Sequence, residues 1–153
     1  MTHLTRRALL IGAAALAFAS PAIAKPAMTV HKSPSCGCCG AWIKHVEKAG
    51  YTVSVVNADD LAPVKAKAGV PDELMSCHTA FVDGYVVEGH VPSEAIDRLL
   101  SLRPAVRGIA VAGMPDNSPG MPAPRPEPFA VMTIPRTGKP EVFLDYPKGY
   151  GAS

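Results

Sequence analysis

Three of the four cysteines in this chain fall within four consecutive positions, in the stretch SPSCGCCGAW at 33–42. Cys36 and Cys39 have the C-x-x-C spacing of a redox dithiol, and Cys38 is an additional thiol that such a pair does not need. Thiolate is the form of cysteine that attacks disulfides, and it is also the form that binds soft metals such as Cu(I), zinc and the iron of iron–sulfur clusters. The cluster therefore indicates a redox dithiol, a disulfide or a metal site.

The additional cysteine favours a metal site over a simple dithiol. In a disulfide-exchange enzyme Cys38 would allow wrong pairings, whereas three thiolates on a turn with Gly37 can converge on soft cations. Because neighbouring positions on a helix point about 100° apart, thiolates that bridge more than one metal ion are easier to arrange than a single tetrahedral site. Two structural disulfides remain an alternative, for which Cys36 and Cys39 have the unstrained spacing.

The fourth cysteine, Cys77, is followed directly by His78 in the stretch MSCHT at 75–79. This pair lies where a helical turn is expected to end and a strand to begin, so its loop can face the start of the first helix. A histidine taken alone is more often a hydrogen-bonded structural residue. Beside Cys77 we predict a metal or redox role for His78, because imidazole and thiolate bind the same soft metals.

Three further residues are weaker candidate ligands. His90 lies in VEGHVP, and Met114 and Met121 lie in GMPDNSPGM. Methionine usually fills gaps in a core, but these two lie in a loop rich in proline and glycine, where no core periodicity is present. A thioether binds Cu(I) well and zinc poorly, so a role for these methionines would favour copper.

The segments around the cysteines predict an α/β fold in the order strand, helix, strand, helix, strand, strand, helix. Strands are expected at 27–32, at 51–57 and, divided into a hairpin by Asp83-Gly84, at 78–91. Amphipathic helices are expected at 40–49, 61–69 and 94–103. A right-handed crossover makes the first two strands parallel and places the cysteine loop at the end of the first strand, where open α/β sheets bind ligands.

Within these elements we expect Trp42 in the core, His45 on a solvated helix face and Ser93 as the cap of the third helix. The last third of the chain has a different character. Six prolines between 114 and 129 exclude a helix or a central strand there. The runs FAVMTI and EVFLDY then predict a closing β-hairpin around Thr137-Gly138.

The first 24 residues have the organisation of an export signal. Arg6 and Arg7 form a short basic region, an apolar run follows, and AIA ends at Ala24 as a cleavage site. The apolar run is shorter than the ~20 residues that span a bilayer, so we predict an exported chain with one domain at 25–153. A buried N-terminal helix is the alternative, and the paired arginines leave the general and the twin-arginine export routes both open.

The composition limits the partners. Without Arg6 and Arg7 the chain carries equal numbers of basic and acidic residues, 13 of each, and no basic run that would neutralise phosphates. Nucleic-acid binding therefore lacks electrostatic support. No other segment of the sequence is long and apolar enough to cross a membrane.

Three stretches together, VHKSPSCGCCGAWIKHVEKAGY, GVPDELMSCHTAFVDGYVVEGHVP and GMPDNSPGM, resemble the exported, thioredoxin-like proteins of the CopG copper-resistance type. The resemblance covers nearly all of residues 28 to 146. It implies a thioredoxin-like domain in the bacterial periplasm that binds copper as a multinuclear Cu(I)–thiolate cluster and acts as a copper oxidoreductase. The family's C-x-C-C and C-H motifs correspond to Cys36, Cys38, Cys39, Cys77 and His78.

One feature departs from thioredoxin itself. Enzymes of that type present a cis-proline before the third strand, facing the dithiol, and in this chain the stretch 77–79 takes that place.

The leading hypothesis is a periplasmic Cu(I)-binding protein with redox capability, with another periplasmic copper-handling or electron-donor protein as its partner. The alternatives are copper buffering without turnover, a metal-free thiol–disulfide oxidoreductase using Cys36 and Cys39, an iron–sulfur carrier and a structural zinc site.

Overall fold

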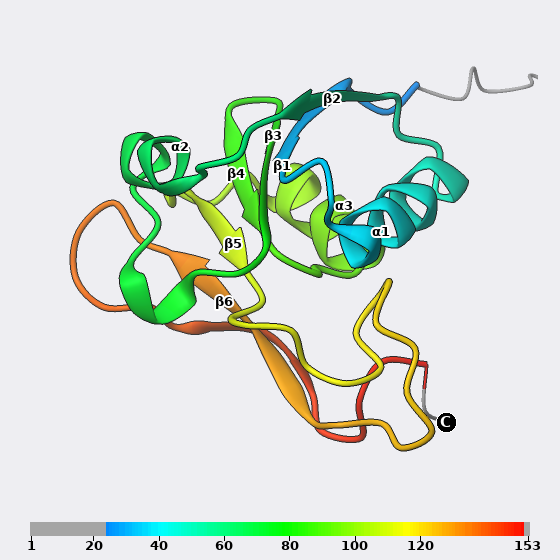
Figure 1. The fold of residues 1–153 in the computed structure, drawn as a ribbon. Coiled ribbons are helices and arrows are strands. Elements are labelled where there is room, and N and C mark those ends of the chain that lie inside the picture. The colour runs from blue at the N-terminus through cyan, green and yellow to red at the C-terminus, as the bar shows by residue number, and fades with distance from the viewer. Residues whose placement is uncertain (1–23, 152–153) are drawn as a thin grey trace, which may run out of the picture.

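A computed structural model describes residues 24–151, and the predicted export signal therefore lies outside the described residues except for Ala24. Among these residues seven strands form one sheet in the order β2-β1-β3-β4-β5-β6-β7, and three α-helices pack on it (Figure 1). The elements are β1 (Met28–Lys32), α1 (Gly37–Lys48), β2 (Val53–Asn57), α2 (Ala62–Ala68), β3 (His78–Val82), β4 (Tyr85–Glu88), α3 (Ser93–Leu102), β5 (Gly108–Ala110), β6 (Phe129–Ile134) and β7 (Val142–Tyr146). A 3-10 turn, Asp72–Leu74, precedes β3.

The mixed α/β class and the predicted order of the first seven elements are confirmed. Strands β1 and β2 are parallel, and β3 runs antiparallel to both β1 and β4. The register pairs Lys32, the last residue of β1, with His78, the first residue of β3. The loop that follows β1 and the loop that precedes β3 therefore meet at the same end of the sheet. The four cysteines lie there, with Cys36 at the end of the first loop, Cys38 and Cys39 in the first turn of α1, and Cys77 directly before β3.

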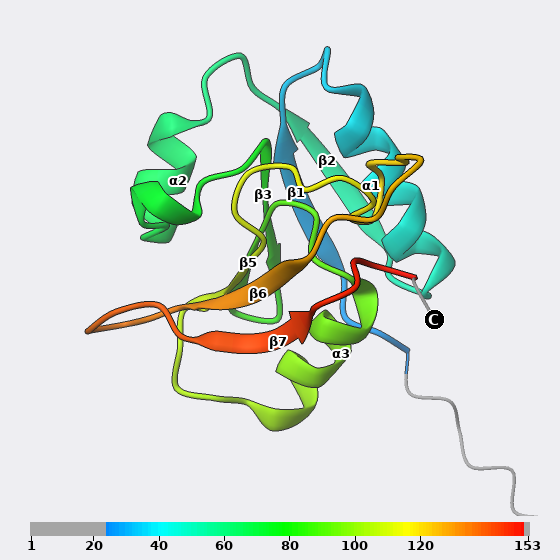
Figure 2. The same ribbon diagram turned by 90° about the horizontal axis from the view of Figure 1, so that it is seen from below.

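The helices are divided between the two faces of the sheet, with α1 and α3 on one face and α2 on the other (Figure 2). The larger core lies under α1 and α3, where both helices bury apolar side chains against the central strands. Its helical members are Trp42, Ile43, Val46, Ala95, Ile96 and Leu99. A smaller cluster lies under α2, around Ala68, Val70, Leu74, Val86, Ala110 and Ile134.

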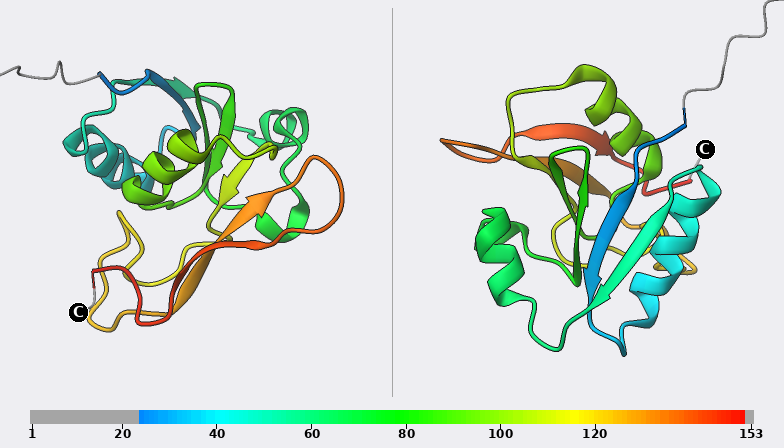
Figure 3. Two further views of the ribbon diagram at one scale, coloured as in Figure 1. Left: turned by 180° about the vertical axis from the view of Figure 1, so that it is seen from behind. Right: turned by 90° about the horizontal axis from the view of Figure 1, so that it is seen from above.

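The C-terminal hairpin is present as predicted, with β6 antiparallel to β7 (Figure 3). Strand β5, which the sequence did not indicate, joins this hairpin to the rest of the sheet by pairing with β4 and β6. Three residues are too few to show a strand periodicity. A Cβ at Gly108 would lie 1.8 Å from the carbonyl oxygen of Val86, so this close strand contact requires glycine.

Two predictions about the helices need correction. His45 is half-buried rather than solvated, and its Nε2 accepts the backbone N–H of Ser93 at 3.0 Å. Ser93 is the first residue of α3 rather than its cap, because Pro92 occupies the N-cap position. The close packing of α1 on α3 supplies an imidazole as the acceptor that a capping side chain would otherwise provide.

Other local predictions are confirmed. Trp42 is fully buried, as expected. The stretch 114–128 contains neither helix nor strand. Within the described residues no helix has the length and apolar character needed to cross a membrane.

Candidate metal centre

The four cysteines meet between the N-terminal turn of α1 and the start of β3. Cys36 is the N-cap of α1, and its Sγ accepts the backbone N–H of Cys39 at 3.3 Å. Cys77 directly precedes β3. The four Sγ atoms all lie within 4.8 Å of one another. The structure therefore brings together the C-x-C-C and C-H motifs, although Cys39 and Cys77 are 38 positions apart in the sequence.

The oxidation state of the cluster is mixed in this structure. Cys36 and Cys39 form a disulfide, and Cys38 and Cys77 are free thiols. The Sγ of Cys77 lies 3.6 Å from that of Cys39 and 4.0 Å from that of Cys38, and the Sγ atoms of Cys36 and Cys38 are 3.5 Å apart. Two electrons and two protons would convert the disulfide into thiols, and all four sulfurs would then be available as ligands.

Two imidazoles approach the same cysteine from a second direction. The Nδ1 of His78 lies 3.3 Å and the Nε2 of His90 lies 3.0 Å from the Sγ of Cys77. These three residues form a second group of potential ligand atoms within 4.8 Å of one another. His90 was a weaker candidate than His78 in the sequence, and the structure brings both to the site. Cys77 thus belongs to a four-sulfur group and to a group with two nitrogens.

The orientation of His90 is determined by the proline-rich loop. Its Nδ1 lies 2.7 Å from the carbonyl oxygen of Pro119, so Nδ1 carries the proton and Nε2 presents its lone pair toward Cys77.

The proline-rich loop also lies against the start of α1 (Figure 1). A Cβ on Gly120, whose φ is +89°, would lie 2.7 Å from the backbone nitrogen of Trp42 and 2.9 Å from the carbonyl oxygen of Cys38. Only glycine allows this approach.

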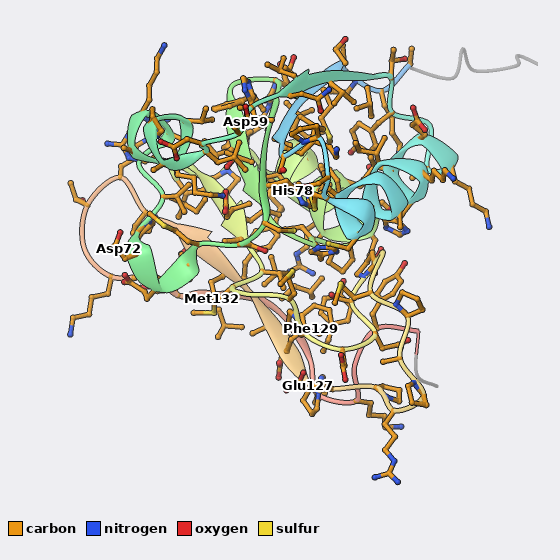
Figure 4. All side chains as sticks on the ribbon, viewed as in Figure 1. Asp59, Asp72, His78, Glu127, Phe129 and Met132 are labelled. Atoms are coloured by element: carbon orange, nitrogen blue, oxygen red, sulfur yellow. A yellow bond between two sulfur atoms is a disulfide. The ribbon has the colours of Figure 1, made fainter. Side chains whose placement is uncertain are left out.

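His78 lies between the sheet and α1 (Figure 4), where its ring centroid is 4.3 Å from that of Trp42. Among the described residues its Nε2 is the one buried side-chain nitrogen or oxygen without a hydrogen-bond partner. Burial holds the pKa of His78 well below its usual value, and the nearby His90 and Lys65 lower that pKa further. The imidazole is therefore neutral at physiological pH, which is the form that ligates metals.

The thiol of Cys77 is also perturbed. Burial, with the neighbouring Cys38 as the second cause, raises the pKa of the Cys77 thiol to about 12. Burial likewise lowers the pKa of His90, although the hydrogen bond to Pro119 opposes that shift. In the metal-free protein this corner of the site is therefore uncharged. A soft cation would displace the thiol proton and supply the positive charge that stabilises a thiolate.

The two methionine candidates have different surroundings. Met114 is 50 % exposed in the proline-rich loop. The backbone of Met121 is bonded within that loop, to Ser118 and Asn117. Both methionines remain predictions as ligands.

A buried ion pair that the sequence did not indicate lies beside the site. Lys65 of α2 and Glu88 of β4 contact each other, with Nζ and Oε1 2.5 Å apart. The Oε1 of Glu88 also accepts the backbone N–H of Ser76, the residue before Cys77. The register places Glu88 opposite Thr79, but no sequence periodicity pairs Glu88 with a lysine on α2.

Comparison with known proteins places these motifs in a family. A family model described as a protein of unknown function, DUF411, matches residues 74–121. Two solved structures of copper resistance protein CopG, its form 2 and its form 1, are each 42% identical to this chain. They cover 80% of this chain and 99% and 98% of their own, with TM-scores of 0.77 and 0.76. No curated protein matches the chain.

The family model spans the C-H pair, His90 and the first part of the proline-rich loop, up to Met121, and the solved structures extend the similarity over most of the chain. These matches agree with the clustered cysteines that the C-x-C-C and C-H motifs bring together. The chain belongs to the CopG copper-resistance family.

Proposed function

We propose that this chain is a periplasmic copper-binding protein of thioredoxin-like topology that takes part in copper resistance. Its cargo is Cu(I), held by the four cysteines in a site with more than one ion, and His78 and His90 complete the donor set on the side of Cys77. The observation that carries the proposal is the convergence of four sulfurs and two neutral imidazoles within a few ångströms.

The chemistry of the donors supports copper over other metals. Thiolate and imidazole both suit Cu(I). Three of the four thiolates point in different directions from one helical turn, which disfavours the single tetrahedral ion of a structural zinc site. Cys77 contacts both the cysteines of α1 and the two histidines, so its sulfur is suited to bridge two ions. The Nε2 of His78 is buried without a hydrogen-bond partner. A soft cation would give this nitrogen a partner, directly or after the ring changes orientation on binding.

The dithiol can also exchange electrons with bound copper, which gives the protein a redox role. Oxidation of the Cys36 and Cys39 thiolates to the observed disulfide releases two electrons, which reduce two Cu(II) ions to Cu(I). A periplasmic electron-donor or copper-handling protein would return the two electrons to the disulfide. The expected export signal at residues 1–24 agrees with that compartment.

The experiment is elemental analysis of mature protein isolated from the periplasm after growth with copper, together with a count of free thiols. We expect more than one copper per chain in the wild type and less than one in Cys38→Ser. Ser35→Ala, in the same loop, is the matched control and should keep the wild-type copper content. Copper-free wild-type protein with an intact disulfide would refute the proposal, and iron or zinc in place of copper would indicate another metal.

The disulfide itself favours a second candidate, a metal-free thiol–disulfide oxidoreductase that uses Cys36 and Cys39. This function does not require Cys38. Under it, Cys38→Ser would reduce a model disulfide substrate at the wild-type rate, and Cys36→Ser would be inactive. The copper content of the same variants distinguishes the two functions.

A further inference from the structure

The buried ion pair between Lys65 and Glu88 lies on the opposite side of β3 from the metal-site histidines. Glu88 is fully buried and Lys65 is 6 % exposed. Successive residues of a strand point to opposite faces, so His78 points toward α1 while Thr79 points toward α2 and contacts this pair. The backbone at 76–79 therefore contacts the ion pair on one face of the sheet and carries Cys77 and His78 of the metal site.

Glu88 holds that backbone at both ends. Its Oε1 accepts the N–H of Ser76 at 2.7 Å, and its Oε2 accepts the hydroxyl of Thr79 at 2.7 Å. Lys65 donates to Oε1 and, at 3.1 Å, to the hydroxyl oxygen of Thr79. The two carboxylate oxygens therefore bracket Cys77 and His78, the two residues that lie between these contacts.

The same strand end also carries the second histidine. His90 follows Glu88 after a turn at Gly89, whose N–H donates to the carbonyl oxygen of His78 at 3.0 Å. A Cβ on Gly89 would lie 2.4 Å from the Oγ of Ser76. The loop before β3 and the turn after β4 are thereby joined, and the distance from Cys77 to His90 depends on that junction.

Stability alone does not account for this arrangement. Removing a carboxylate and an ammonium from water is energetically costly, and well-packed apolar residues of similar volume often stabilise a core equally well. A carboxylate accepts several donors at once, which an apolar side chain cannot do. The value of Glu88 is that it gives the N–H of Ser76 and the hydroxyl of Thr79 a buried acceptor.

We propose that Glu88 is a positioning residue of the metal site. Its carboxylate, neutralised by Lys65, holds the backbone at 76–79 so that the sulfur of Cys77 faces both the cysteines of α1 and the two histidines. This inference rests on the proposed copper-binding function. It adds a residue that does not touch the metal and acts through the backbone on either side of Cys77 and His78.

The test measures Cu(I) affinity of the reduced mature protein by competition with a chromophoric Cu(I) chelator. We expect Glu88→Gln to weaken affinity by 10-fold or more, in line with the effect of residues that orient metal ligands. Glu73→Gln is the matched control, because Glu73 is exposed on the 3-10 turn before β3. Wild-type affinity in Glu88→Gln would overturn the inference.

A double variant separates positioning from folding. Lys65→Met with Glu88→Leu removes both buried charges and keeps the site packed, so thermal stability should return toward the wild-type value. The donors of Ser76 and Thr79 remain without an acceptor, so Cu(I) affinity should stay at least 10-fold weaker. Affinity that recovers together with stability would show that the ion pair is only structural.

Amide exchange in the metal-free protein gives a readout independent of copper. The N–H of Ser76 should exchange at least 10-fold faster in the double variant than in the wild type, because its acceptor is lost. Unchanged exchange would overturn the inference. If the wild type itself bound no Cu(I), the proposed function would fail, whereas equal binding by wild type and Glu88 variants would refute only the role of Glu88.

Discussion

At the scale of single residues, Cys77 is the point where the two halves of the site meet. Its sulfur lies within 4.0 Å of the sulfurs of Cys38 and Cys39 and within 3.3 Å of ring nitrogens of His78 and His90. Burial makes its thiolate unfavourable without a neighbouring positive charge. Cys77 is therefore suited to hold a metal and poorly suited to attack a disulfide.

This environment predicts slow alkylation of Cys77. With the pKa of the thiol raised from 9.0 to about 12, the thiolate fraction at pH 8 falls by about 1000-fold, and burial limits access of the reagent further. In oxidised, metal-free Cys38→Ser protein, Cys77 is the only free thiol. This variant loses the contribution of Cys38 to the raised pKa but keeps burial, which is the larger cause. We expect iodoacetamide to modify it at least 100-fold more slowly than in the same protein unfolded in guanidinium chloride, measured by intact mass. Equal rates would contradict this account of the site.

At the scale of elements, the contact between α1 and α3 contains a group that titrates. Nε2 of His45 accepts the N–H of Ser93, and burial lowers the pKa of His45 below its usual 6.5, with Glu94 opposing the shift. An imidazolium cannot accept this hydrogen bond. The packing of the two helices that cover the main core is thereby linked to pH.

The sign of this dependence follows from the lowered pKa. The unfolded chain takes up a proton near pH 6.5, whereas the folded chain resists protonation of His45, so the free energy of unfolding falls as the pH drops below about 6.5. His45→Gln keeps a carbonyl oxygen as acceptor and does not titrate. The loss of stability between pH 7 and pH 5 should be smaller in this variant by roughly 1 kcal/mol, about the value of one hydrogen bond.

Urea unfolding at the two pH values measures this difference. The lowered pKa values of His78 and His90 contribute to both proteins alike, so the comparison isolates His45. An identical pH dependence in wild type and variant would mean that the contact with Ser93 does not respond to protonation.

At the scale of the whole molecule, we expect the fold to be independent of the disulfide. The bond between Cys36 and Cys39 closes a ring of only four residues, whereas the main core lies between the sheet and the helices α1 and α3. A ring of this size contributes about 2 kcal/mol in the chain-entropy model. The reduced protein, which presents four thiols to copper, should therefore keep the same fold.

Reduction of the metal-free wild type should lower the free energy of unfolding by about 2 kcal/mol and leave a single cooperative transition. Urea unfolding followed by the fluorescence of Trp42, the one tryptophan in the chain, measures both quantities. Cys36→Ser combined with Cys39→Ser is the control, and its stability should not respond to the reductant. Loss of the transition in reduced wild-type protein would show that the fold requires the disulfide.

The features that could be predicted from the sequence alone are local. The positions of the cysteine loop at the start of α1 and of the hairpin between β3 and β4 follow from helical periodicity and from Asp83 and Gly84, which both adopt positive φ. The clustering of Cys36, Cys38 and Cys39 was visible in their spacing alone. These signals depend on residues a few positions apart, which the local backbone conformation brings together.

The contacts between distant groups, by contrast, follow from the tertiary fold and could not be predicted. The approach of His90 to Cys77 depends on the register of β3 with β4, and the orientation of its ring depends on a carbonyl oxygen 29 residues away at Pro119. The pairing of Lys65 with Glu88 requires α2 to pack on the sheet. Such contacts leave no periodic trace in a sequence, because strand register and helix packing are set by burial of the whole core rather than by neighbouring residues.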